Sequence, residues 1–283
     1  MGIGNEELGM EIRIADDFDL KKIVDSGQCF RPREIEPGVY RFICGEKILH
    51  LRGDNGIFEA DCSAEDWLSV WKNYFDLDTD YAAIRRDILN FAADKPYEKI
   101  LRDAVTFGKG IRILKQEPFE TLISFIISQR KNIPAIRSSV EKICARFGRR
   151  VDDVHLFPRV TEISSATIDD LTGLGLAYRK DYISDAVQKI SGGDIDLTAL
   201  EKFSDDDLVG ELKKIRGVGD KVANCVALFA YHRVDRAPVD VWIRRALDED
   251  FGGENIFDNF GANAGILQQY VFYHKRNAKR AAN

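Results

Sequence analysis

The stretch that decides the fold is a pair of glycines between two helix-forming segments: Ile215-Arg216-Gly217-Val218-Gly219-Asp220-Lys221-Val222-Ala223-Asn224-Cys225. Apolar residues recur at helical spacing over 206–215 and 222–230, so the sequence predicts two helices joined by a turn that only glycine accommodates. Gly217 and Gly219 leave the first N–H groups of the second helix without partners. Such a helix terminus binds anions, and we expect a phosphate there.

Two chemically active residues follow this turn. Lys221 falls in the first turn of the second predicted helix, where the positive end of the helix dipole makes a neutral, nucleophilic amine easier to reach. Asp240 comes nineteen residues later, directly before the helical pattern 241–247, where it would be a good N-cap. On their own these residues leave three alternatives open: a surface lysine, a simple helix cap and a plain helical corner.

The composition is that of an ordinary globular protein that stays inside the cell. With 283 residues and 45% apolar content, the chain can hold one large or two modest domains. No apolar run approaches the roughly 18 residues of a membrane span, and residues 1–17 lack the layout of a signal peptide. Five scattered cysteines argue against a disulfide framework or a cysteine-bound metal cluster, so we expect no metal and no cofactor.

The net charge of −6 argues mildly against a nucleic-acid partner, because phosphates are bound by Lys and Arg. The distribution matters more than the sum. Acidic residues gather over 46–80 and 205–207, whereas basic residues gather over 130–150 and 275–280. These patterns fit one basic face on an acidic body, and they also fit ordinary solvated helix faces.

Along the chain, strand patterns precede helical ones. Strands are predicted at 10–14, 39–44, 47–52 and 57–62, with hairpin turns at 45–46 and 54–56. Ser63 reads as the cap of a first helix, and helices are then predicted at 81–107 with a break at Pro96, and at 117–129, 133–147, 178–190, 241–247 and 260–274. The predicted class is α+β, with an N-terminal antiparallel sheet domain at 1–115 and a helical domain at 116–283.

Several strings together point to one family. These are the glycine pair with Lys221 and Cys225, Pro238-Val239-Asp240-Val241, residues 26–31 and 173–179, and residues 264–268 running on to Phe272. In this combination the chain resembles the helix-hairpin-helix DNA base-excision glycosylases, and more narrowly the 8-oxoguanine DNA glycosylase/lyases. The likeness covers nearly the whole sequence, and it implies the fold class above without an iron-sulfur cluster.

The resemblance also implies an activity. The damaged base leaves the duplex and enters a pocket. Lys221 attacks C1′, displaces the base and forms a Schiff base, from which β-elimination nicks the strand. Asp240 stabilises the positive charge that develops on the sugar.

A base-binding pocket is implied by four further residues. Cys225 and Phe272 cover the two faces of the flipped base, and Gln268 contacts its edge. The backbone carbonyl of Gly27 distinguishes the protonated N7 of 8-oxoguanine from the bare N7 of guanine. Taken singly, these positions fit a core cysteine, a core aromatic, a core glutamine and a loop glycine.

Contacts to the DNA itself are expected from Gly217, Gly219 and Asn132, and from Tyr178 with Arg179. Two positions depart from the family pattern: Trp242 replaces a common histidine, and Ala135 stands where a second partner-base arginine is expected. Only the first of the two arginines, Arg179, is evident. We therefore expect the base opposite the lesion to be recognised loosely.

The sequence thus predicts a monomer whose partner is double-stranded DNA containing 8-oxoguanine, without contact to a membrane. It would act in the cytoplasm, on the nucleoid of a prokaryote, or in the nucleus of a eukaryote. Two alternatives remain: a glycosylase/lyase for another oxidised base, and a non-catalytic helix-hairpin-helix module that would need neither Lys221 nor Asp240.

Overall fold

The computed structural model describes residues 9–281, with side chains up to Asn277. The chain forms two compact units that are not continuous in sequence. The sheet unit comprises the residues up to Gln28, Pro32–Lys115 and the chain from Val239 onward, and the hairpin unit comprises Cys29–Arg31 and Gln116–Pro238. The predicted division at 115/116 coincides with one passage between the units, but 239–281 packs in the sheet unit, and the division into domains stays a prediction.

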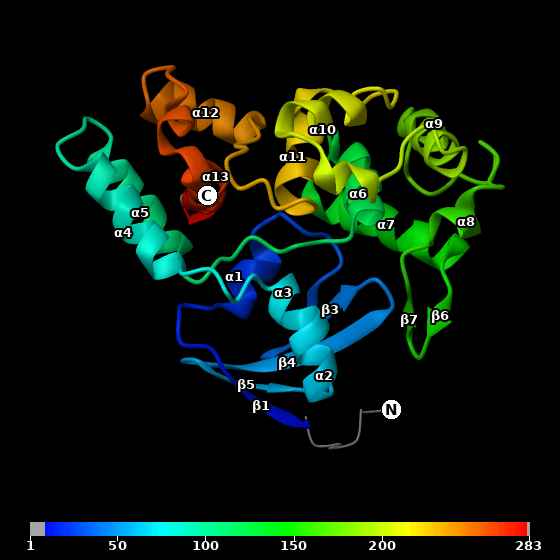
Figure 1. Ribbon diagram of the computed structural model, residues 1–283, viewed down its shortest axis with the longest axis horizontal. Helices are drawn as coiled ribbons and strands as arrows, with labels where there is room; N and C mark the ends of the chain where they lie inside the picture. The colour runs from blue at the N-terminus through cyan, green and yellow to red at the C-terminus, as the bar shows by residue number, and fades with distance from the viewer. Residues whose placement is uncertain (1–8, 282–283) are drawn as a thin grey trace. The chain divides into compact units, whose positions relative to one another are not determined.

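The sheet unit contains a five-stranded antiparallel sheet of order β1-β5-β4-β3-β2 (Figure 1). Its strands are β1 (Met10–Arg13), β2 (Arg33–Glu36), β3 (Val39–Cys44), β4 (Lys47–Asp54) and β5 (Ile57–Ala60). The predicted turns are confirmed, because Cys44 pairs with Lys47 and Asp54 pairs with Ile57. Asn55 and Gly56 both have positive φ, as a two-residue hairpin turn requires.

One face of this sheet carries a core of aromatic rings. Phe75 is fully buried and makes edge-on contacts with Phe18 and Phe42, at centroid distances of 5.2 and 4.9 Å. Rings in this arrangement gain about 0.5–1.5 kcal/mol per pair beyond the burial of their area. The sheet is therefore fixed to the helices that follow it, α2 (Ala64–Asp66), the π-helix η1 (Trp67–Trp71) and α3 (Lys72–Tyr74). Ser63 caps α2 through the N–H of Asp66, as predicted.

The other helices of the sheet unit are α1 (Leu20–Asp25), α4 (Tyr81–Ala92), α5 (Glu98–Gly108), α12 (Val241–Asp250), the 3₁₀ helix η3 (Ile256–Asn263) and α13 (Ala264–Ala281). The break predicted at Pro96 separates α4 from α5. Helix α13 packs closely on α5: a Cβ on Gly108 would lie 2.5 Å from Cδ1 of Tyr270. The last helix begins at Ala264 and not at 260, because Gly261 has φ +49 and interrupts the helical conformation.

The hairpin unit is mainly helical. It contains α6 (Pro118–Ser128), α7 (Ile133–Phe147), the short strands β6 (Arg150–Val151) and β7 (Val154–His155), α8 (Val160–Ile163), α9 (Arg179–Ser191), the 3₁₀ helix η2 (Ala199–Lys202), α10 (Asp205–Leu212) and α11 (Asp220–Phe229). Helix α6 is buried over nearly its whole circumference, as its apolar sequence predicted. It packs against α11.

These elements confirm the α+β class, in which an antiparallel sheet is followed by a mainly helical part of the chain. Within residues 9–281, no helix is both long enough and apolar enough to cross a bilayer.

Candidate active site

The glycine pair forms the expected turn between α10 and α11. Gly217 has φ +80, and a Cβ there would lie 2.2 Å from the Tyr182 ring, so both conformation and packing require glycine. Gly219 is the N-cap of α11 and supplies no side chain to the first N–H groups of that helix. No side chain therefore caps this end of the helix, and the binding of a phosphate there stays a prediction.

Lys221 lies in the first turn of α11 and is partly buried. Its Nζ is 3.3 Å from the hydroxyl oxygen of Ser128, at the end of α6, and 5.0 Å from the centroid of the Phe125 ring. The Ser128 hydroxyl donates to the carbonyl of Phe125 at 2.8 Å, so its oxygen is left to accept from the amine. Cys225, one helical turn beyond Lys221, is 4% exposed.

The loop between α6 and α7 is tied to the hairpin and to α9. Gln129 donates from Nε2 to the carbonyl of Gly217 at 3.1 Å. Lys131 donates from Nζ to Ser139 Oγ and Gly175 O, both at 2.6 Å. Desolvation, and then the charges of Arg179 and Lys142, lower the pKa of Lys131. Asn132 uses its side-chain oxygen as the N-cap of α7.

Tyr178 and Arg179 lie at the start of α9 and differ in exposure. The Tyr178 side chain is 44% exposed and stacks on the guanidinium of Arg179 at 4.5 Å, whereas Arg179 is only 4% exposed. Nε and Nη2 of Arg179 donate to the carbonyl of Gln129, and Nη1 donates to that of Leu176. Each guanidinium nitrogen therefore already holds a backbone carbonyl, and a role in recognising the partner base stays a prediction.

Asp240 belongs to the sheet unit, where it is the N-cap of α12. Its Oδ1 accepts from the N–H groups of Trp242 and Ile243, at 2.9 and 2.8 Å, which confirms the predicted cap. Val241 beside it is 75% exposed. Trp242, which stands in place of the family histidine, packs on the guanidinium of Arg245 at 5.2 Å.

The remaining base-binding candidates also lie in the sheet unit. Gln268 and Phe272 are one turn apart on α13; Gln268 is 4% exposed, and Phe272 is partly exposed with Arg276 5.7 Å from its ring. Gly27 follows α1 with φ +83 and is partly exposed between two fully buried residues, Ser26 and Gln28.

The predicted site residues are thus divided between the units. The hairpin unit holds Lys221, Cys225, Gly217, Gly219, Asn132, Tyr178 and Arg179, and the sheet unit holds Asp240, Gly27, Gln268 and Phe272. Sequence reasoning missed four polar residues that support them: Ser128, Gln129, Gln28 and Gln269. Ser128 and Gln129 left a detectable signal, since they end a largely apolar helix, and Gln28 lies within the string 26–31, whereas the buried Gln269 left none.

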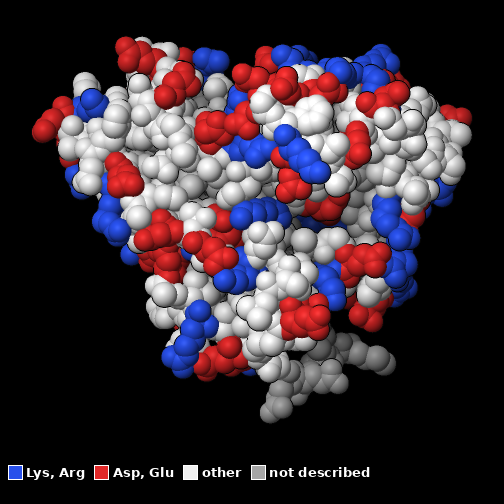
Figure 2. All heavy atoms as spheres, in the orientation of Figure 1, with Lys and Arg blue, Asp and Glu red and all other residues white. Residues whose placement is uncertain are grey.

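The charged side chains do not separate by sign on the face in view. Figure 2 shows Lys and Arg interleaved with Asp and Glu there. In the predicted C-terminal basic segment, Lys275 is paired with Glu249 and Asp250, at 3.0 and 2.6 Å, and the side chains of Lys279 and Arg280 lie outside the described part of the chain. Of the charged segments, the one over 130–150 is the stronger candidate for phosphate contacts.

Comparison with known proteins identifies the family. Residues 11–122 match the family described as 8-oxoguanine DNA glycosylase, N-terminal domain, and residues 123–258 match the HhH-GPD superfamily of base excision DNA repair proteins. The N-glycosylase/DNA lyase of Saccharomyces cerevisiae is 33% identical over 225 residues, a match that spans 72% of this chain and 58% of the yeast protein. A probable N-glycosylase/DNA lyase of Methanothermobacter thermautotrophicus is 26% identical over 93% of this chain and 95% of its own length.

A solved structure extends the likeness over both units. The Clostridium acetobutylicum 8-oxoguanine glycosylase/lyase, in complex with double-stranded DNA containing cytosine opposite 8-oxoguanine, is 32% identical with a TM-score of 0.86. The match covers 96% of this chain and 99% of the Clostridium chain. From its sequence and its fold, this chain therefore belongs to the 8-oxoguanine DNA glycosylases of the HhH-GPD superfamily of base excision DNA repair proteins.

Proposed function

We propose that the protein excises 8-oxoguanine from duplex DNA and then cleaves the strand at the abasic site, with Lys221 as the nucleophile. The observation that carries this proposal is the position of Lys221: its amine lies at the start of α11, next to the bare N–H groups of the Gly217–Gly219 turn and within 3.3 Å of a hydroxyl. A phosphate held by the turn would bring the DNA backbone next to a nucleophile.

The chemistry follows from the amine. Lys221 Nζ donates its electron pair to C1′ of the flipped nucleotide, and the bond from C1′ to the base breaks with its electrons going to the base nitrogen, which takes up a proton. The C1′–O4′ bond of the sugar ring then breaks: its electrons go to O4′, which takes up a proton, and the nitrogen lone pair forms an imine between Nζ and C1′. Loss of a proton from C2′ then expels the 3′ phosphate, and water hydrolyses the imine to release the lysine. Asp240, held as the cap of α12, supplies the carboxylate that stabilises the cationic sugar.

We assign the remaining candidate residues to binding of the base. Cys225 and Phe272 cover the faces of the base, Gln268 contacts its edge, and the carbonyl of Gly27 accepts the N7–H that 8-oxoguanine has and guanine lacks. Because the substrate is chromosomal DNA, we place the protein on the nucleoid of a prokaryote or in the nucleus of a eukaryote, acting as a monomer.

Borohydride trapping tests the proposal directly, because only an imine is reduced to a stable link. On a duplex containing 8-oxoguanine, the wild-type protein should give a covalent complex that Lys221→Gln abolishes. Asp240→Asn should slow base release strongly with the fold kept, since Asn also caps helices well. Undiminished trapping by Lys221→Gln would assign the nucleophile elsewhere, and unfolding of Asp240→Asn would favour a purely structural aspartate.

The same assay separates the alternatives. A glycosylase for another lesion would excise an oxidised pyrimidine in preference to 8-oxoguanine across a panel of duplexes. A non-catalytic module would bind all of them without being trapped.

A further inference from the structure

The segment around Gly27 is held on both sides by buried hydrogen bonds. Ser26 is fully buried, and its Oγ donates to the carbonyl of Ile23 at 2.7 Å. Its backbone carbonyl accepts from Nε2 of Gln269, on α13, at 2.8 Å. Gln269 is itself 2% exposed, so this bond is made away from water, between segments 243 residues apart in sequence.

On the other side of Gly27, the side-chain amide of the fully buried Gln28 is hydrogen-bonded through both its nitrogen and its oxygen. Its Nε2 donates to Ser26 Oγ at 3.0 Å and to the carbonyl of Arg112 at 2.9 Å, and its Oε1 accepts from the N–H of Leu114 at 2.8 Å. One glutamine therefore ties the residue before the glycine to the extended segment 111–114.

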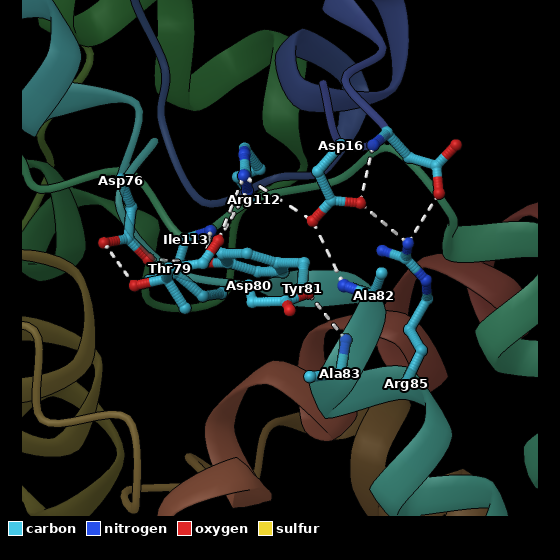
Figure 3. A network of polar contacts seen from close by, with 11 residues as sticks. Asp16, Asp76, Thr79, Asp80, Tyr81, Ala82, Ala83, Arg85, Arg112 and Ile113 are labelled. Atoms are coloured by element: carbon cyan, nitrogen blue, oxygen red, sulfur yellow. Dashed lines mark hydrogen bonds and ion pairs between the residues drawn. The ribbon is translucent and has the colours of Figure 1, made fainter. Parts of the chain in front are cut away.

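That segment is in turn fixed by the polar network of Figure 3. The N–H of Ile113 donates to the hydroxyl of Tyr81 at 2.8 Å, and this hydroxyl donates to Asp76 at 2.9 Å. The guanidinium of Arg112 stacks on the Tyr81 ring at 4.3 Å and donates to the carbonyl of Thr79. Burial raises the pKa of Tyr81 well above its ordinary value, so the phenol stays protonated and keeps donating to Asp76.

Gly27 differs from its neighbours in this arrangement. Among residues 9–281, neither its N–H nor its carbonyl makes a hydrogen bond, although both flanking side chains are fully bonded. Its φ of +83 is a conformation that glycine adopts without strain. A backbone carbonyl left unbonded and partly exposed between two rigidly held residues is suited to accept a hydrogen bond from a ligand.

We propose that Gln269 and Gln28 are positioning residues for base recognition: they fix the peptides on either side of Gly27 so that its carbonyl accepts the N7–H of 8-oxoguanine. This inference rests on the proposed function. Neither glutamine touches the base; each acts through the backbone. Selectivity depends on the direction of one carbonyl, because a hydrogen bond weakens steeply as its angle falls.

The test replaces Gln269 by Met, which keeps the length of the side chain and removes the single bond to Ser26. Three quantities are measured: single-turnover release of 8-oxoguanine, cleavage of a preformed abasic site, and, in a Lys221→Gln background, the ratio of affinities for duplexes containing 8-oxoguanine and guanine. Gln269→Met should slow base release at least fivefold and reduce the affinity ratio by a similar factor. Cleavage of a preformed abasic site, which has no N7, should stay within twofold of wild type.

Two further variants guard against misfolding. Gln28→Glu keeps the acceptor for Leu114 but loses the donors to Ser26 and Arg112, and it should show the same selective loss. Gln188→Met, the same change at an exposed position on α9, should alter none of these quantities. Thermal melting of each variant shows whether the fold is kept.

The possible outcomes distinguish a failure of this inference from a failure of the proposed function. Wild-type protein that fails to release 8-oxoguanine would overturn both. Gln269→Met with wild-type release and an unchanged affinity ratio would overturn the inference alone. An equal loss on base release and on abasic-site cleavage would also overturn it, because it would assign the glutamine a general structural role.

Discussion

Removing the hydroxyl of Ser128 should slow the reaction of Lys221 by a factor that the structure bounds. The Nζ–Oγ distance of 3.3 Å is slightly longer than the usual 2.7–3.2 Å, so we take the lower range for hydrogen bonds, about 0.5–1.5 kcal/mol. At about 1.36 kcal/mol per tenfold, Ser128→Ala should reduce the rate roughly two- to thirteenfold. The amine would keep its contact with the Phe125 ring but lose the acceptor that orients it.

The measurement is single-turnover formation of the borohydride-trapped complex on a duplex containing 8-oxoguanine. Ser128→Thr keeps the hydroxyl and should stay closer to wild type. Ser138→Ala makes the same change at an exposed position on α7 and serves as the matched control. If Ser128→Ala is no slower than Ser138→Ala, the hydroxyl does not orient the nucleophile and the reasoning is refuted.

Three other predictions can be checked independently. DNA affinity should fall by about 0.9 log units per log unit of salt for each phosphate neutralised, and a flat response would count against DNA as the partner. Excision opposite C, T, G and A should show only a shallow preference, because Ala135 cannot donate a hydrogen bond; strict dependence on C would contradict this. Desolvation raises the pKa of Glu120 from 4.5 to about 7, so the folded state binds that proton more tightly, and the free energy of unfolding should fall as the pH rises from about 4.5 to 7. Urea titrations should show this loss in wild type but not in Glu120→Gln.

Local sequence patterns predicted much of the secondary structure, and there is a physical reason for each strand that they failed to predict. The β3–β4 hairpin joins a strand rich in aromatic and β-branched residues to the next strand by a two-residue turn, so the local sequence predicts it. Strand β2 was missed because Arg33-Glu34-Ile35-Glu36 is charged and mostly exposed, paired on one side only as an edge strand. The short strands β6 and β7 have two residues each, too few for any period to appear.

The local structure around a site residue was predictable where it depends only on residues within about one helical turn. Lys221 at the start of a helix and Asp240 as a cap follow from their immediate neighbours. The bond between Gln269 and Ser26 joins positions 243 residues apart, and a glutamine in a helix says nothing about which distant carbonyl it will meet. The partner of Gln269 could therefore not be predicted from local pattern, although the residues that it supports could.

Arg179 shows that a residue of a family motif can also hold the local backbone in place. Removing this guanidinium would leave the carbonyl of Gln129 without its two side-chain donors, at a cost of about 1–3 kcal/mol, whereas the carbonyl of Leu176 would keep the backbone N–H of residue 179 as a donor. Because Gln129 also bonds Gly217, that loss would reach the turn that precedes Lys221. A substitution at Arg179 is thus expected to disturb the hairpin that carries Lys221 whichever base lies opposite the lesion, and with it the half-exposed Tyr178 ring that stacks on the guanidinium.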